Sequence, residues 1–103
     1  MGCYDDGRLY VDFDERQVAV DGKTGDLRQR DYDVLTALIS HRGQALSPEQ
    51  LIDLAAWDDR GRVGRDRMKY ALARLKHDLG WTEPNGPIET IRGVGWRYRS
   101  PSE

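Results

Sequence analysis

The stretch IETIRGVGWRY, residues 88–98, decides the fold of this chain. Two β-prone runs, residues 88–92 and 96–99, flank the tripeptide Gly93-Val94-Gly95. Glycine adopts tight-turn conformations that β-branched residues resist, so this tripeptide predicts a turn between two short strands. We therefore expect a β-hairpin at the carboxyl end of the sequence.

An amphipathic segment precedes the hairpin and predicts a helix over residues 64–79, ending at Gly80. Its apolar stripe recurs at helical spacing and consists of Met68, Leu72, Leu75 and Leu79. The opposite side carries Arg67, Tyr70, Arg74 and His77. A positive face on a helix that packs by its other face is typical of nucleic-acid binding.

Two shorter helices are predicted upstream. Residues 30–42 form the first, which ends before Gly43 and has an apolar side made of Tyr32, Val34, Leu35, Leu38 and Ile39. The second starts with a capping box between Ser47 and Gln50 and has Pro48 in its first turn. It is expected to run to about Trp57 and to bury Leu51, Leu54 and Ala55.

Two β-prone runs near the amino end, residues 8–13 and 17–21, predict a small antiparallel sheet. A third short strand is expected at residues 26–28, before the first helix. The domain is predicted to span residues 7–99, with flexible ends at residues 1–6 and 100–103. The expected fold class is α+β, with an N-terminal antiparallel sheet, three helices and a C-terminal hairpin.

Composition restricts the alternatives. A chain of 103 residues with 38% apolar side chains builds one small domain. No apolar run approaches the roughly 20 residues that cross a membrane, and no secretory pattern is present, so the expected location is the cytoplasm. One cysteine, Cys3, and two histidines, His41 and His77, give neither a disulfide nor metal-ligand spacing, so no metal or cofactor is expected.

The net charge of -2 hides an asymmetry along the chain. Residues 1–59 contain six basic against thirteen acidic groups, whereas residues 60–99 contain ten basic against four acidic groups. One face of the domain should therefore be negative and another positive.

The order of sheet, helices and hairpin is that of a winged helix-turn-helix. From about Leu9 to Tyr98 the chain closely resembles the C-terminal effector domain of OmpR/PhoB-type response regulators. The hairpin is the strongest match, because the family typically reads I-x-T-V-R-G-x-G-Y-R there. Residues 71–79 resemble its I-x-R-L-R-K-K-L, and residues 46–51 its V-S-R-E-Q-L. The resemblance implies sequence-specific binding of double-stranded DNA by a bacterial two-component regulator, with the third helix in the major groove and the hairpin as a wing.

The chain also departs from the family pattern. Arg28 stands where a capping Thr is often found, and Pro48 replaces a common Arg. Asp66 lies where an Arg that touches phosphate is often found, and Arg65 is a substitute for it one residue away. Ala71 occupies a position where the family often presents a polar side chain to DNA. The DNA sequence that relatives recognise is therefore not transferable.

The third helix supplies most of the candidate DNA contacts. Arg74 is the first candidate for the two hydrogen bonds that arginine makes to guanine. Arg67 and Tyr70 share its face and are expected to reach bases or the DNA backbone. Lys69 and Lys76 lie at the flanks of that face and are expected to contact phosphates. For each, the alternative is a solvated surface side chain.

The hairpin supplies the remaining candidates. Thr90 and Arg92 lie two apart on a predicted strand and share a side, which suits a wing on the DNA backbone or in the minor groove. Arg97 is a weaker candidate, because pairing with a nearby carboxylate explains it as well. Trp57, Trp81 and Trp96 each border a predicted element and are interpreted as packing residues.

The resemblance also suggests partners. The segment 58–64, which begins with Asp58 and ends with Gly64, corresponds to a loop that can touch RNA polymerase in this family. A full-length relative carries an N-terminal receiver domain, which this chain is too short to include, and binds DNA as a dimer. The alternative function is a protein-interaction winged helix, which the net negative charge favours. No motif assembles a nucleophile, a base and an oxyanion site, so an enzyme is not expected.

Overall fold

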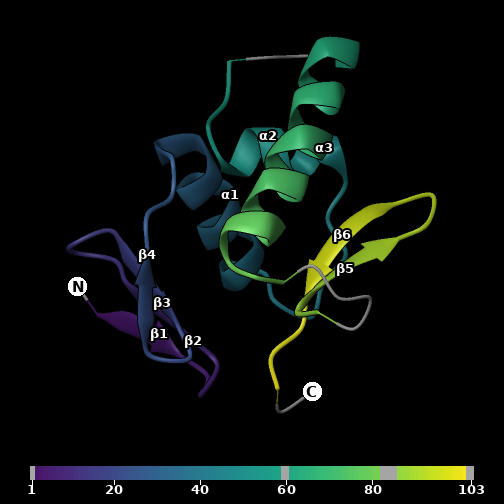
Figure 1. Ribbon diagram of the computed structural model, residues 1–103. Coiled ribbons are helices and arrows are strands. Elements are labelled where there is room, and N and C mark those ends of the chain that lie inside the picture. Colours follow the sequence, from purple (N-terminus) through teal and green to yellow (C-terminus); the bar gives the residue numbers. More distant parts are fainter. Residues whose placement is uncertain (1, 59–60, 82–85, 102–103) are drawn as a thin grey trace.

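The computed structural model describes residues 2–58, 61–81 and 86–101. Within these residues the chain forms a four-stranded sheet, three helices and a two-stranded hairpin (Figure 1). The elements are β1 (Cys3–Asp5), β2 (Leu9–Asp12), β3 (Gln17–Val20), β4 (Lys23–Gly25), α1 (Gln29–Ser40), α2 (Pro48–Leu54), α3 (Gly61–Asp78), β5 (Ile88–Ile91) and β6 (Gly95–Tyr98). The predicted α+β fold is confirmed.

The N-terminal sheet is antiparallel and has the order β1-β2-β3-β4. Strand β1 corrects the expectation of a flexible end at residues 1–6, because Cys3–Asp5 pairs along its length with β2. The Asp6 carboxylate accepts hydrogen bonds from the backbone N–H groups of Arg8 and Leu9 and holds the turn between the two strands. At the other end of the chain Ser100 is buried, so the ordered domain also extends past residue 99.

The third predicted strand, at residues 26–28, was placed wrongly, because β4 covers Lys23–Gly25. The chain reverses through Asp21 and Gly22, whose φ angles are 51° and 83°. Two consecutive residues with positive φ make a two-residue hairpin turn. The returning strand therefore begins at once, and Val18 pairs with Gly25.

Helix α1 is amphipathic as predicted. All five residues of its expected apolar side, Tyr32, Val34, Leu35, Leu38 and Ile39, are buried. The helix also buries Asp31, in its first turn, which the apolar periodicity did not predict.

Helix α2 begins at the predicted capping box. The Ser47 hydroxyl accepts a hydrogen bond from the Gln50 backbone at 3.1 Å, and the Gln50 side chain accepts one from the Ser47 backbone at 2.8 Å. The helix ends at Leu54, earlier than expected, because Ala56 adopts a left-handed φ of 57°. The predicted stripe was wrong at one position: Leu54 is 45% exposed, and Ile52 is buried.

Helix α3 begins at Gly61, three residues before the predicted start. The predicted loop at residues 58–64 is therefore shorter, since residues 61–64 form the first helical turn; residues 59–60 lie outside the described part. The apolar stripe of Met68, Leu72, Leu75 and Leu79 is buried as predicted. Ala71 is buried as well, so it faces the core and not a ligand.

The hairpin of β5 and β6 is attached to the linker that precedes α2. Leu46 and Trp96 exchange two backbone hydrogen bonds of 2.8 and 2.9 Å. A Cβ at Gly95 would lie 1.9 Å from the Leu46 carbonyl oxygen. Gly95 therefore permits close approach of two backbone segments, while Gly93, with φ 79°, makes the turn itself.

In Figure 1 the N-terminal sheet lies to the left of the hairpin, and the two meet where Tyr98 of β6 contacts Tyr4 of β1 and Asp6. Trp57, Trp81 and Trp96 are buried in the core between these elements, which confirms their packing role. Among the described residues, no helix combines the length and the apolar character that a membrane span requires.

Candidate nucleic-acid interface

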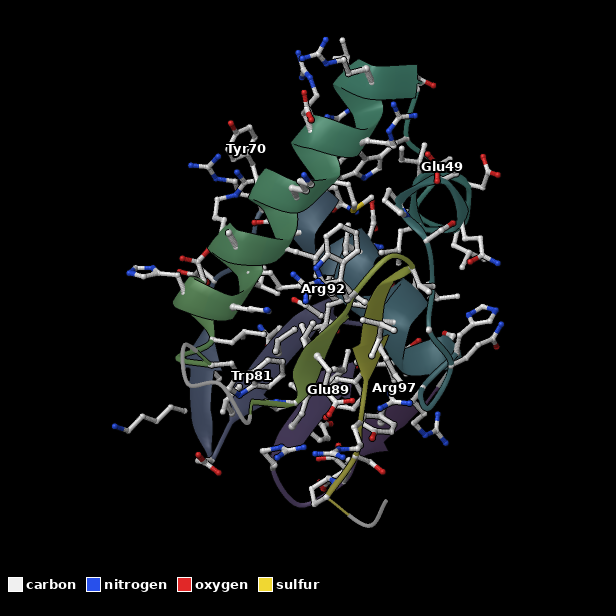
Figure 2. All side chains as sticks on the ribbon, turned by 90° about the vertical axis from the view of Figure 1, so that its right-hand side faces the viewer. Glu49, Tyr70, Trp81, Glu89, Arg92 and Arg97 are labelled. Carbon is white, nitrogen blue, oxygen red and sulfur yellow. The ribbon has the colours of Figure 1, made fainter. Side chains whose placement is uncertain are left out.

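Seen from the side of the hairpin, α3 and the hairpin lie in front of α1 and the N-terminal sheet (Figure 2). Tyr70 lies on one side of α3 in this view, and the hairpin with Arg92 lies on the other. The two elements with an excess of basic residues therefore lie next to each other, in front of α1. The acidic N-terminal strands lie behind them.

The solvent-facing side of α3 carries most of the predicted contacts. Tyr70 is 71% exposed, and Val63, one turn before Arg67, is 58% exposed. Arg65, Arg67 and Lys69 are exposed, and Lys76 is half-buried. The structure thus leaves four predicted candidates accessible, with Arg65 on the flank that meets α2 and Arg67 and Tyr70 on the flank that meets the start of α1.

Arg74 does not stand in solvent as the helical periodicity suggested. Its Nε and Nη2 atoms donate hydrogen bonds of 2.8 Å each to the two carboxylate oxygens of Asp31, whose side chain is 0% exposed. The hydrogen bonds to Asp31 raise the pKa of Arg74 above its ordinary value, against the opposing effect of burial. A buried carboxylate requires such a partner, so Arg74 holds α1 against α3.

Arg65 makes an ion pair with Glu49 of α2. The Nη1 to Oε2 distance is 3.3 Å, and the side chains are 47% and 58% exposed. Pairs as exposed as this contribute little to stability and exchange readily. Arg65 is therefore available to an incoming anion.

The hairpin places Thr90 on β5 and Arg92 in the turn, both exposed. The prediction that both lie on one strand was wrong in detail, because β5 ends at Ile91 and the chain turns through Gly93. Arg92 therefore stands at the tip of the wing.

Arg97 pairs with a carboxylate, as the alternative interpretation predicted. Its Nη2 atom lies 2.6 Å from Glu89 across the hairpin, and Arg99 lies 3.3 Å from the same carboxylate. The hydrogen bonds from Arg97 lower the pKa of Glu89, although partial burial opposes this effect. Arg97 therefore stabilises the pairing of β5 with β6.

Sequence reasoning missed two elements of this site. One is Asp31, and the signal for it was a carboxylate adjacent to the apolar residue Tyr32 at the start of an amphipathic helix. The other is the bridge between Leu46 and Trp96, for which a single sequence holds no local signal.

A cationic third helix together with a hairpin anchored beside it defines a winged helix-turn-helix domain. A family model described as "Transcriptional regulatory protein, C terminal" matches residues 22–98. The chain therefore belongs to this family, and the predicted resemblance to the C-terminal domains of OmpR/PhoB-type response regulators is confirmed.

Individual relatives agree with this assignment. Response regulator ArlR of Staphylococcus saprophyticus is 32% identical over 91 residues, which cover 88% of this chain and 41% of ArlR. The chain thus spans about two fifths of the length of the curated relatives it matches. Response regulator DrrB of Thermotoga maritima, an OmpR/PhoB homolog, superimposes with a TM-score of 0.82 and 27% identity over 96% of this chain and 45% of DrrB.

One similar structure is a complex. The RstA DNA-binding domain of Klebsiella pneumoniae, solved with the RstA box, superimposes with a TM-score of 0.79 and 26% identity. The match covers 96% of this chain and 98% of that domain.

Proposed function

We propose that this chain binds double-stranded DNA in a sequence-specific manner, as the effector domain of a bacterial transcription regulator acting in the cytoplasm. The observation that carries the proposal is that the basic helix α3 and the wing with Arg92 lie beside each other on the side of the molecule seen in Figure 2. A helix fits the major groove, and a wing beside it reaches the adjacent minor groove or backbone. The complex of the RstA domain with its box supports this function.

Each candidate residue has a role in this proposal. Arg67 and Tyr70 reach base edges or the backbone, while Arg65, Lys69 and Lys76 contact phosphates. Arg74 is held by Asp31 through its Nε and Nη2 atoms, so its Nη1 group is the part that can meet DNA. Thr90 and Arg92 place the wing.

The function proposed for the whole protein extends beyond this chain. By its family, the chain is the effector part of a longer regulator that also contains a receiver domain. This full-length regulator binds DNA as a dimer. The effector domain acts by binding and not by catalysis. The segment 58–64, whose last four residues begin α3, is the proposed contact for RNA polymerase. The alternative is a protein-interaction winged helix, which the net charge of -2 favours.

Selection of bound sequences from a random duplex library, followed by titration of the selected duplex at several salt concentrations, tests the proposal. DNA binding predicts an enriched motif and a log-log salt slope of about -0.9 per neutralised phosphate. Absence of measurable duplex binding at low salt favours the protein-interaction function.

A further inference from the structure

A hollow of about 400 Å³ lies between the start of α1 and one flank of α3. It is lined by Arg28, Gln29, Arg30, Trp57, Arg67, Tyr70 and Arg74. The described lining thus carries four guanidinium groups and no carboxylate. Asp31 is buried behind it and bonded to Arg74.

The first turn of α1 adds to the positive charge of these guanidinium groups. Arg28 is the N-cap residue, and within the described residues its side chain makes no capping hydrogen bond. An ordinary cap, such as the Thr often found here in relatives, accepts hydrogen bonds from the backbone N–H groups of the first turn. Arginine cannot accept these hydrogen bonds, and the positive end of the helix dipole favours an anion at this position.

The walls of the hollow hold the arginines in place. The Arg30 guanidinium stacks over the buried Trp57 ring, 4.7 Å from the ring centre. Arg74 is fixed by its two bonds to Asp31. Guanidinium groups that are already ordered lose less side-chain entropy when they bind an anion.

The position of the hollow suggests its ligand. A helix in the major groove is bordered by one phosphate backbone on each side. The wing with Arg92 lies on one side of α3, and Tyr70, which lines the hollow, lies on the other (Figure 2). With α3 in the major groove, the backbone strand away from the wing would pass over the hollow.

We infer that this hollow is a binding site for a backbone phosphodiester of the DNA strand opposite the wing, held by Arg28, Arg30 and the first turn of α1. The inference rests on the proposed function and extends it to a part of the chain that the recognition helix and wing do not include. Arg28 and Arg30 belong to residues 1–59, which have a net negative charge, so the distribution of charge along the sequence does not indicate a site there.

The test compares salt dependence between variants of the whole chain, using both the duplex selected by the wild type and an unrelated duplex. The measured quantity is the slope of the logarithm of the binding constant against the logarithm of the salt concentration. The double variant Arg28→Gln with Arg30→Gln should make this slope less steep by about 0.9 for each lost phosphate contact, on both duplexes. The ratio of the wild-type to the variant binding constant should then fall about 3.5-fold per lost contact when the salt concentration rises from roughly 50 to 200 mM. The pair Arg28→Lys with Arg30→Lys should keep most of the slope.

Lys23→Gln is the matched control, because it removes one exposed positive charge from β4, behind the helices, and should leave the slope unchanged. The inference would be overturned if Arg28→Gln with Arg30→Gln left the salt slope unchanged. It would also be overturned if the change in slope per removed charge were the same as in Lys23→Gln. A lowered melting temperature with an unchanged slope would also overturn it, by showing a structural role. Failure of the wild type to bind any duplex would instead refute the proposed function.

Discussion

The hydroxyl group of Tyr98, the last residue of β6, donates a hydrogen bond of 2.5 Å to the carboxylate of Asp6, which follows β1. The Tyr4 hydroxyl donates to the same carboxylate oxygen at 2.7 Å, and the Tyr4 and Tyr98 rings meet edge to face. The two ends of the chain are therefore joined through one acidic group. The wing strand and the N-terminal sheet are parts of one hydrogen-bonded unit.

This unit predicts a loss of stability in acid. Burial of Asp6 opposes its ionisation, but hydrogen bonds from Tyr98, Tyr4 and the backbone outweigh that effect and lower its pKa. A carboxyl group whose pKa is lower in the folded state contributes stability above its unfolded pKa, near 3.9, and loses it as the pH falls through the folded value. Urea unfolding from pH 6 to pH 2 should show this decline.

Asp6→Asn should flatten that decline, whereas Asp26→Asn, at an exposed position after β4, should retain it. An equal pH dependence in Asp6→Asn and the wild type would contradict the role of Asp6. In alkali the opposite sign applies to Tyr4: burial raises its pKa to about 12, so stability should fall as the pH rises above 10.

Replacement of Arg74 should destabilise the domain. Arg74→Met leaves the buried Asp31 carboxylate without its cation, and such a loss costs about 3 kcal/mol. Replacing both residues, Asp31→Leu with Arg74→Met, should cost less than the sum of the single changes, because neither charge is then left buried alone. Urea denaturation of the four members of this cycle measures the coupling, and additive effects would contradict it.

The double variant also separates stability from DNA reading. If Arg74 contacts a base through Nη1, the folded double variant should lose discrimination at one base pair, on the order of 1–3 kcal/mol. Equal weakening on all sequences would make Arg74 a phosphate contact, and unchanged binding would leave it a structural residue alone.

Gly95→Ala should damage the attachment of the wing. Its added methyl group would meet the Leu46 carbonyl oxygen at 1.9 Å, where only backbone movement relieves the clash. We expect a cost of about 3 kcal/mol, at the upper end for overpacking, and a lower melting temperature. Gly93→Asn is the comparison, because asparagine tolerates the positive φ of that turn and should cost less. Equal melting temperatures would show that the close approach is unimportant.

The charges of the interface should contribute unequally to DNA binding. Arg92→Gln and Lys69→Gln should each reduce the salt slope by about 0.9, because both side chains are exposed. Arg97→Gln also removes one positive charge. Because the Arg97 side chain is bonded to Glu89, its effect on the slope should be small. Fluorescence titrations of one duplex at several salt concentrations measure all three, and equal slopes would indicate a general charge effect.

Local patterns predicted most of the secondary structure. The 3.6-residue stripe of α3, the capping box at Ser47 and the glycines of the wing each depend on neighbours within a few residues, and each was confirmed. Errors occurred where the deciding contact is distant or subtle. The turn at Asp21 and Gly22 shifted β4, and pairing with β2 ordered Cys3–Asp5.

For the candidate site, periodicity identified the exposed side of α3 but not the state of its side chains. Arg74 lies at the edge of that side, and only the packing of α1 against α3 brings it to Asp31, 43 positions earlier in the chain. The hollow beside it likewise combines Arg28 and Arg30 with Arg67, from separate elements.

The amino-acid sequence by itself determined the order and type of the elements from β2 onward, the basic character of the third helix and the family. It did so because helix periodicity, caps and turns are local properties of the chain. Only the tertiary structure decided which arginines face solvent, which one neutralises a buried carboxylate, and how the wing is attached at Leu46. These depend on contacts between residues far apart in sequence, whose partners are set by the packing of the whole core.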